Sequence, residues 1–129
     1  MPILFNKVER VNPQDITAPR KWFPILKTIT QVKEKQVAKE IADETTLNPK
    51  EAEMALSQLE KVLIRNLLAS NSVQLGDWGS FRLTCNGEGS DAKEKVTANK
   101  ITKLNIRFTP GKSLTEALKR VTFIPADTL

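Results

Sequence analysis

The chain has 129 residues, with 20 Lys and Arg against 15 Asp and Glu, no His and a single Cys. Its length suits one domain, and the net charge of +5 favours a polyanionic partner without requiring one. Without His, and with Cys85 as the lone thiol, we expect no enzymatic activity, metal site, cofactor or small-molecule substrate. No apolar run approaches the roughly 20 residues of a membrane span, and Met1–Arg10 lacks a signal-peptide pattern. We therefore expect a cytoplasmic protein.

The first 28 residues hold four of the seven prolines and resemble an N-terminal extension. Residues 3–11 and 21–26 are predicted to form short extended pieces, separated by a turn at Asn12-Pro13. Trp22 and Phe23 could stack on bases, but an apolar pair between prolines is more typical of an anchor that packs an extension onto a core.

Two helices are predicted next. Residues 33–45 show apolar positions at helical spacing, and Asn48-Pro49-Lys50-Glu51 forms a capping box that opens a longer helix. The longer helix carries a wide apolar stripe, made of Ala52, Ala55, Leu56, Leu59, Val62, Leu63, Leu67 and Leu68. A single subunit could hardly cover that stripe, which favours a dimer.

Strands follow the helices. Val73 and Leu75 alternate with polar residues before a turn, and Trp78 to Leu83 continue as the second strand of a hairpin. Residues 85–91 are polar and should project, whereas 101–108 resume a strand pattern. Pro110-Gly111 ends that strand, and Ser113 with Glu116 predicts a capping box on a last helix. The expected order is two helices, three strands and one helix.

This order, with the segments Gly76-Asp77-Trp78-Gly79-Ser80-Phe81 and Arg107-Phe108-Thr109-Pro110-Gly111-Lys112, resembles the bacterial histone-like HU and integration host factor superfamily. With its extension, the chain is most similar to a divergent Bacteroidetes branch. The resemblance covers residues 33–122, which implies an HU-like DNA-binding domain there. Residues 1–32 would be an extension packed on the core, and 123–129 a C-terminal tail.

The resemblance implies an α+β fold and an intertwined homodimer with crossing second helices and a three-stranded antiparallel sheet. It also implies duplex DNA binding with little sequence specificity, nucleoid organisation and DNA condensation, by arms that enter the minor groove. The expected arm, Thr84 to Asn105, is shortened and departs from the family pattern. It lacks the arginine-asparagine-proline tip, so no bending wedge can be assigned to it.

Candidate DNA-contacting residues are basic or hydroxyl side chains near these motifs, namely Ser80, Arg82, Lys93, Lys95, Lys100, Lys103, Arg107 and Lys112. Backbone groups near Ser80 could approach a phosphate, and Lys112 lies beside a helix start that could bind an anion. For Arg107 and Lys112 we favour phosphate contact over a solvated charge, and Lys100 and Lys103 come next. Lys93 and Lys95 are weaker candidates because of the acids beside them, and the segment around Ser80 could be only a hairpin turn. Lys33, Lys35 and Lys39 are more typical of a solvated helix face.

Acidic residues in the arm, Glu88, Asp91 and Glu94, leave a second function open. An HU-fold dimer could have lost strong DNA binding and bending, and could serve as a structural or protein-interaction module. A nucleic-acid enzyme is a third class, but the sequence contains no histidine, paired carboxylates or phosphate loop to support it.

Overall fold

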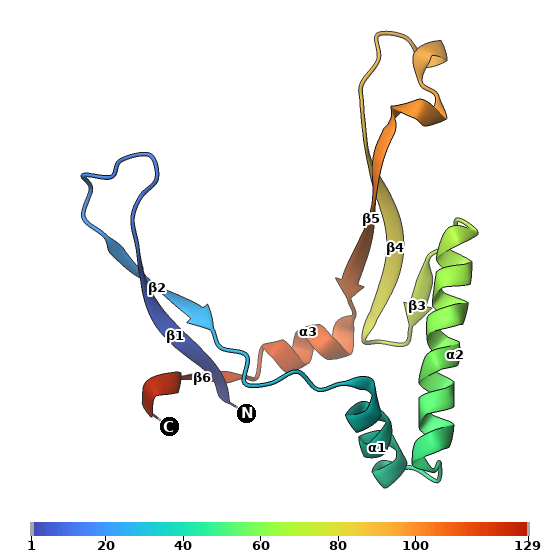
Figure 1. Ribbon diagram of the computed structural model, residues 1–129, viewed down its shortest axis with the longest axis horizontal. Helices are drawn as coiled ribbons and strands as arrows, with labels where there is room; N and C mark the ends of the chain where they lie inside the picture. Colours follow the sequence, from blue (N-terminus) through green and yellow to red (C-terminus); the bar gives the residue numbers. More distant parts are fainter. Residues whose placement is uncertain (1, 129) are drawn as a thin grey trace. The chain divides into compact units, whose positions relative to one another are not determined.

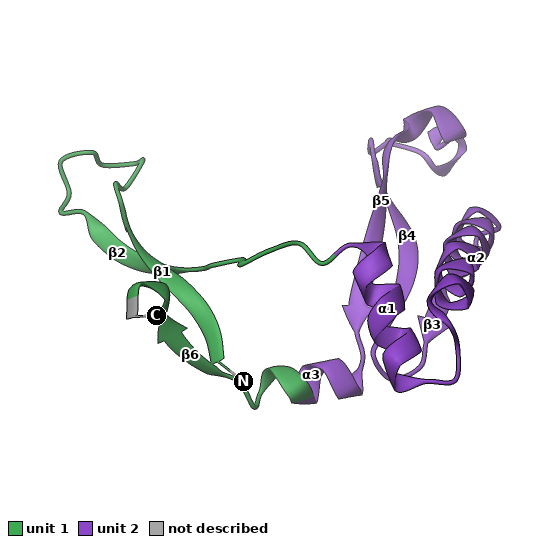
Figure 2. Cartoon of the chain, turned by 60° about the horizontal axis from the view of Figure 1, so that its bottom comes forward, with its two compact units in different colours: residues 1–32, 117–129 green, residues 33–116 purple. Residues whose placement is uncertain are grey.

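The computed structural model describes residues 2–128, which form three α-helices and two three-stranded sheets (Figure 1). The chain divides into two compact units (Figure 2). One contains residues 33–116, and the other contains residues 1–32 together with 117–129. The mixed α+β class expected from the sequence is confirmed, and within residues 34–118 so is the order of two helices, three strands and one helix.

Helix α1 spans Glu34–Glu44 and helix α2 spans Pro49–Leu68, close to the predicted limits. The predicted capping box at the start of α2 is confirmed. The Glu51 amide donates to Asn48 Oδ1 over 2.9 Å, and the Asn48 amide donates to Glu51 Oε1 over 3.4 Å. None of the helices within residues 2–128 has the length and hydropathy to cross a bilayer.

The sheet of the 33–116 unit consists of β3 (Val73–Leu75), β4 (Gly79–Gly87) and β5 (Ile101–Pro110), in that order and antiparallel. β3 pairs only with the first residues of β4. Beyond that point β4 and β5 continue as a two-stranded ribbon towards the loop of residues 88–100 (Figure 1). The predicted hairpin and third strand are therefore confirmed.

An aromatic cluster packs at the base of this sheet, and close backbone packing joins its hairpin turn to the start of helix α3 (Lys112–Leu118). Trp78, Phe81 and Phe108 form a cluster with ring centroids 5.0 to 6.1 Å apart. Gly79 is buried, and a Cβ there would collide with the Phe108 ring. A Cβ on Gly111 would collide with the carbonyl of Asp77 in the hairpin turn. These two glycines are thus required for close packing.

The predicted capping box at Ser113 is wrong, because α3 begins one residue earlier, at Lys112. Ser113 lies inside the first turn, and its amide donates to the Asp77 carbonyl over 3.0 Å. The Gly111 amide likewise donates to the Trp78 carbonyl over 2.9 Å. The start of α3 is therefore held by the backbone of the hairpin turn rather than by a side-chain cap.

The second unit is built around a sheet with the order β2-β1-β6. β1 (Pro2–Arg10) pairs antiparallel with β2 (Lys21–Leu26) and parallel with β6 (Thr122–Pro125). The extended pieces predicted at the N-terminus are confirmed as strands. Sequence analysis gave no sign of β6, because residues 123–129 read only as a tail. The boundary between the two units falls within α3.

Few apolar side chains of the described chain are fully buried. The buried apolar residues are Ala38, Ala52 and Leu67, on the two N-terminal helices. Larger apolar side chains of α2 stay exposed, with Ile64 at 48% and Leu68 at 71%. A helix of 20 residues with so much uncovered apolar surface is incompletely packed within one subunit.

Candidate nucleic-acid interface

Strand alternation places four of the predicted residues on one face of the β4–β5 ribbon. Successive side chains in a strand point to opposite faces, so Ser80 and Arg82 of β4 share a face with their partners on β5. In the register, Ser80 aligns with Thr109, Arg82 with Arg107, and Asn86 with Lys103. The structure thus brings Ser80, Arg82, Lys103 and Arg107 together, and we call them the ribbon face.

The ribbon face is cationic and contains no acid, since neither β4 nor β5 includes an Asp or Glu. Arg82 and Arg107 are both exposed and lie directly opposite each other. Like charges in a cross-strand pair repel, and this costs stability when nothing neutralises them. A phosphate between the two guanidinium groups would remove that repulsion and gain charge-assisted hydrogen bonds.

Amide and hydroxyl side chains maintain the strand pairing next to Lys103. Asn105 Nδ2 donates to Asn86 Oδ1 over 3.3 Å, and Thr102 Oγ1 donates to the Asn86 carbonyl over 3.2 Å. The register shifts between Asn86 and Gly87, which is where regular pairing ends. Lys103 therefore marks the distal limit of the ribbon face.

The loop of residues 88–100 differs from the ribbon in charge. It contains three basic and three acidic side chains, so its net charge is zero. Lys93 and Lys95 lie in a 3₁₀ turn on either side of Glu94, and Lys100 Nζ lies 3.8 Å from Glu88 Oε2. Such an exposed ion pair is worth about 0–1 kcal/mol, but it offsets the charge that Lys100 presents. The structure does not place these three lysines on the ribbon face.

Val96 is a feature of this loop that sequence reasoning missed. It lies between the 3₁₀ turns Lys93–Lys95 and Ala98–Lys100, and it is 61% exposed. A bending wedge is expected to be a proline or a larger apolar residue, so a single valine among polar neighbours gives no signal in the sequence. Within the 88–100 loop, Val96 is the large apolar side chain that is exposed.

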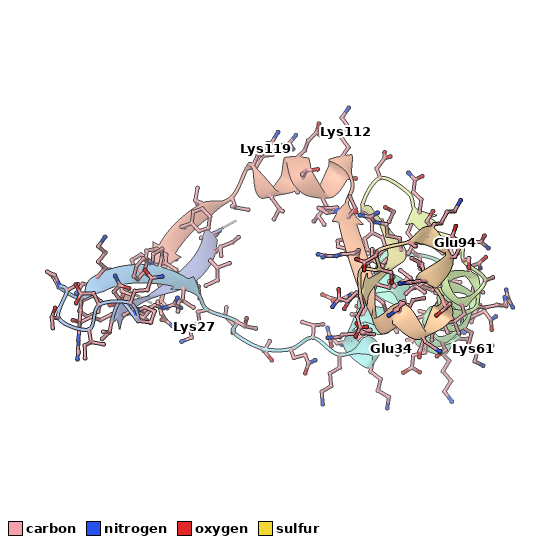
Figure 3. All side chains as sticks on the ribbon, turned by 90° about the horizontal axis from the view of Figure 1, so that it is seen from above. Lys27, Glu34, Lys61, Glu94, Lys112 and Lys119 are labelled. Atoms are coloured by element: carbon pink, nitrogen blue, oxygen red, sulfur yellow. The ribbon has the colours of Figure 1, made fainter. Side chains whose placement is uncertain are left out.

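Lys112 is the first residue of α3 and lies near Ser80. Both residues line a shallow depression of about 260 Å³, together with Asp77 and Thr109. The amides of Gly111 and Ser113 already donate to carbonyls of the hairpin turn, so they are not free for an anion. The anion site expected at this helix start stays a prediction, and the Lys112 side chain, labelled in Figure 3, is exposed beside it.

The opposite face of the ribbon is apolar. Leu83 shares it with the more exposed Leu104 and Ile106, which are 60% and 64% exposed. A groove of about 570 Å³ lies beside it, lined by Leu83, Leu104 and the end of α2 at Leu67 and Leu68, and also by Arg82 and the polar residues 70–72. By alternation, the ribbon thus carries basic side chains on one face and exposed Leu104 and Ile106 on the other. Within residues 2–128, no group of three or more His, Cys, Asp or Glu side chains could hold a metal ion.

Taken together, the helix pair, the ribbon and the cationic face define a class of α+β protein built like the HU proteins. The family model for an HU domain fused to wHTH, Ig, or glycine-rich motif (HU-HIG) matches residues 1–125, and the chain belongs to this family. That match includes both units apart from the last residues.

A solved structure from Bacteroides vulgatus, described provisionally as a bacterial DNA-binding protein, has a similar fold. The TM-score is 0.68 at 15% sequence identity, over 96% of the present chain. The chain spans about half of that protein, since the match covers 47% of it. No curated protein matches the sequence.

Proposed function

We propose that this protein is a histone-like protein that binds duplex DNA with little sequence specificity, through phosphate contacts, and contributes to nucleoid organisation and DNA condensation in the cytoplasm. The observation that carries the proposal is the ribbon face, an acid-free surface on which Arg82 and Arg107 lie side by side. Membership of the HU-HIG family supports DNA as the partner. We infer a Bacteroidetes-type branch, and the N-terminal sheet is consistent with it.

We further propose that the working form is a homodimer in which two α2 helices cover each other. Exposed Ile64 and Leu68 on α2, and the groove beside Leu104, supply uncovered surface for a second copy. Interfaces of obligate dimers are apolar, like the interior of a domain. The exposed apolar side chains of α2 are the kind of surface that such an interface covers. Pairing would bring two ribbon faces to one duplex.

The site consists of the ribbon face at its centre and Lys112 beside it. Lys93, Lys95 and Lys100 belong to the proposed site as peripheral contacts, because loop acids offset their charge. The contacts would be made to phosphates and carry no sequence information, which fits low specificity. No catalytic role is proposed.

Charge reversal tests this proposal. A triple variant with Lys103→Glu, Arg107→Glu and Lys112→Glu should lose retention of a duplex in a gel shift. The matched control is Lys33→Glu, Lys35→Glu and Lys39→Glu, which changes the net charge equally on and beside α1. The control should lose far less affinity, and both variants should keep the oligomeric state of the parent protein. Equal retention by the two variants would reject the ribbon face as the site.

The neutral 88–100 loop favours one competing function, a dimer that has kept the HU scaffold but interacts with protein instead of DNA. The gel shift separates the two functions. A folded dimer that fails to retain linear, bent or cruciform DNA at low salt would support the protein-interaction role.

A further inference from the structure

The β2-β1-β6 sheet has one face rich in apolar and aromatic side chains. Alternation and register place Trp22, Pro24 and Leu26 of β2 on the same face as Phe5 and Lys7 of β1 and Phe123 of β6. These side chains line a hollow of about 560 Å³, to which Phe23 also contributes. The hollow lies entirely within the unit of residues 1–32 and 117–129.

The large side chains of this face are open to solvent. Trp22 is 67% exposed, Leu26 is 62% exposed and Phe123 is 59% exposed. An anchoring role for Trp22 requires burial, and the structure does not show it. Clustered exposed aromatic side chains of this kind mark a binding surface.

Positive charge is concentrated in the same unit. Residues 1–32 and 117–129 contain seven basic and three acidic side chains, a surplus of four, out of a chain total of five. Residues 33–116 contain thirteen basic and twelve acidic side chains, a surplus of one. Lys27 and Lys119, labelled in Figure 3, belong to the basic set. The surplus favours an anionic ligand for the aromatic face.

The acids of this unit offset part of its positive charge, including the charge on the aromatic face. Asp15 lies in the β1–β2 connection, where the Thr17 hydroxyl donates to Asp15 Oδ1 over 2.6 Å and the Thr17 amide over 3.0 Å. These hydrogen bonds lower the pKa of Asp15. Glu9 is the acid that shares the face, since it aligns with Trp22. Lys7 is the neighbouring cation on the same face and lines the hollow.

We propose that the aromatic face of the β2-β1-β6 sheet is a second nucleic-acid site, which binds single-stranded DNA or RNA by stacking unpaired bases on Trp22 and Phe123. Bases within a duplex are stacked on each other, so aromatic side chains on an open sheet are useful for unpaired bases. Lys7 would neutralise a phosphate on this face, and the positive surplus of the whole unit would attract the strand. This site is separate from the ribbon face and does not depend on the proposed duplex binding.

The spacing of the two rings suits a short strand. Trp22 aligns with Glu9 and Phe123 with Ile3, and these two positions of β1 are six residues apart along the strand, or about 20 Å. A single strand of roughly four nucleotides, at the lower end of known site sizes on sheet surfaces, would connect the two rings. A small apolar ligand would use the hollow but would not explain the cationic surplus.

Fluorescence and anisotropy test the site in the full chain. The sequence contains two tryptophans, so Trp78→Phe leaves Trp22 as the only fluorophore, and a 20-nucleotide oligothymidylate should quench it. Trp22→Ala and Phe123→Ala, in the parent chain, should each weaken binding of the labelled oligonucleotide about tenfold. The matched control is Ile25→Ala, on the same strand but the opposite face, which should leave the affinity unchanged.

Two results would overturn the proposal. One is equal oligonucleotide affinity in Trp22→Ala and Ile25→Ala. The other is a Trp22 fluorescence that acrylamide cannot quench in the free protein, which would mean that a second copy or another segment covers the face. The variant with Lys103, Arg107 and Lys112 reversed should keep most single-strand binding, so failure of the duplex proposal is distinguishable from failure of this one.

Discussion

At the scale of single residues, the glycines of the sequence motifs act through packing. Gly111 lies against the backbone of Asp77, and Gly79 lies against the ring of Phe108. These contacts fix the hairpin turn against the start of α3, so that Ser80 and Lys112 line one depression. The glycines of the motif thus hold the turn and α3 together beside the candidate nucleic-acid interface. The adjacent arginines carry the positive charge of that interface.

Gly111→Ala should lower the free energy of unfolding by about 1–3 kcal/mol, because the added Cβ meets a backbone carbonyl that cannot rotate away. Urea denaturation measures the change. Gly89→Ala is the matched control, since a Cβ there meets no atom within 4 Å. Equal stability of the two variants would show that the turn and α3 are not packed as described.

At the scale of elements, α2 shows how local sequence fixes a boundary. Its first residue is Pro49, and the cap residue Asn48 accepts from the amide of Glu51. Replacing a capping Asn by Ala removes the acceptor for an otherwise unpaired helix amide.

Asn48→Ala should therefore destabilise the protein by about 1 kcal/mol, measured as the shift in the urea midpoint at constant slope. Asn48→Asp keeps the acceptor and should remain within a few tenths of a kcal/mol of the parent. If the Asp variant loses as much stability as the Ala variant, the cap is not the cause.

Features set by neighbouring residues were predictable from the sequence, and those set by distant pairing were not. Helical periodicity and the Asn48 cap located α2, and alternation located β4 and β5. Thr122 to Pro125 form a strand only because they pair with β1, at the other end of the sequence, which no local pattern reveals. At the start of α3, the Ser113 motif was overridden by backbone contacts with Asp77.

The site divides in the same way. Basic residues near the motifs could be selected from the sequence, but their grouping required the strand register. The alignment of Arg82 with Arg107, and the separation of Lys100 onto a neutral loop with Glu88, depend on which residues of β4 and β5 face each other. Counting charges along the sequence does not distinguish the acid-free ribbon face from the neutral 88–100 loop.

At the scale of the whole molecule, the proposed pairing through the uncovered α2 surface would make stability depend on protein concentration. Sedimentation equilibrium should give twice the chain mass of 14.5 kDa, and the thermal midpoint should rise with concentration. A folded single subunit at micromolar concentration, with a midpoint independent of concentration, would contradict the homodimer.

Duplex binding by phosphate contacts should also weaken steeply with salt. If about four to six phosphates are neutralised, the plot of log affinity against log salt concentration should have a slope of about −4 to −5. Fluorescence anisotropy of a labelled duplex measures this, and the slope should become shallower by about one for each phosphate-contacting cation removed. A slope near zero would contradict the mechanism.

The parallel pairing of β1 with β6 joins residues that are about 120 positions apart, with Pro2 aligned to Thr122. While the chain is being synthesised, the first strand leaves the ribosome long before its partner exists. One edge of β1 must then remain open, beside exposed aromatic side chains, until the last residues arrive. A product truncated before residue 122 would keep that open edge permanently, with the tendency to self-associate that unpaired strands carry.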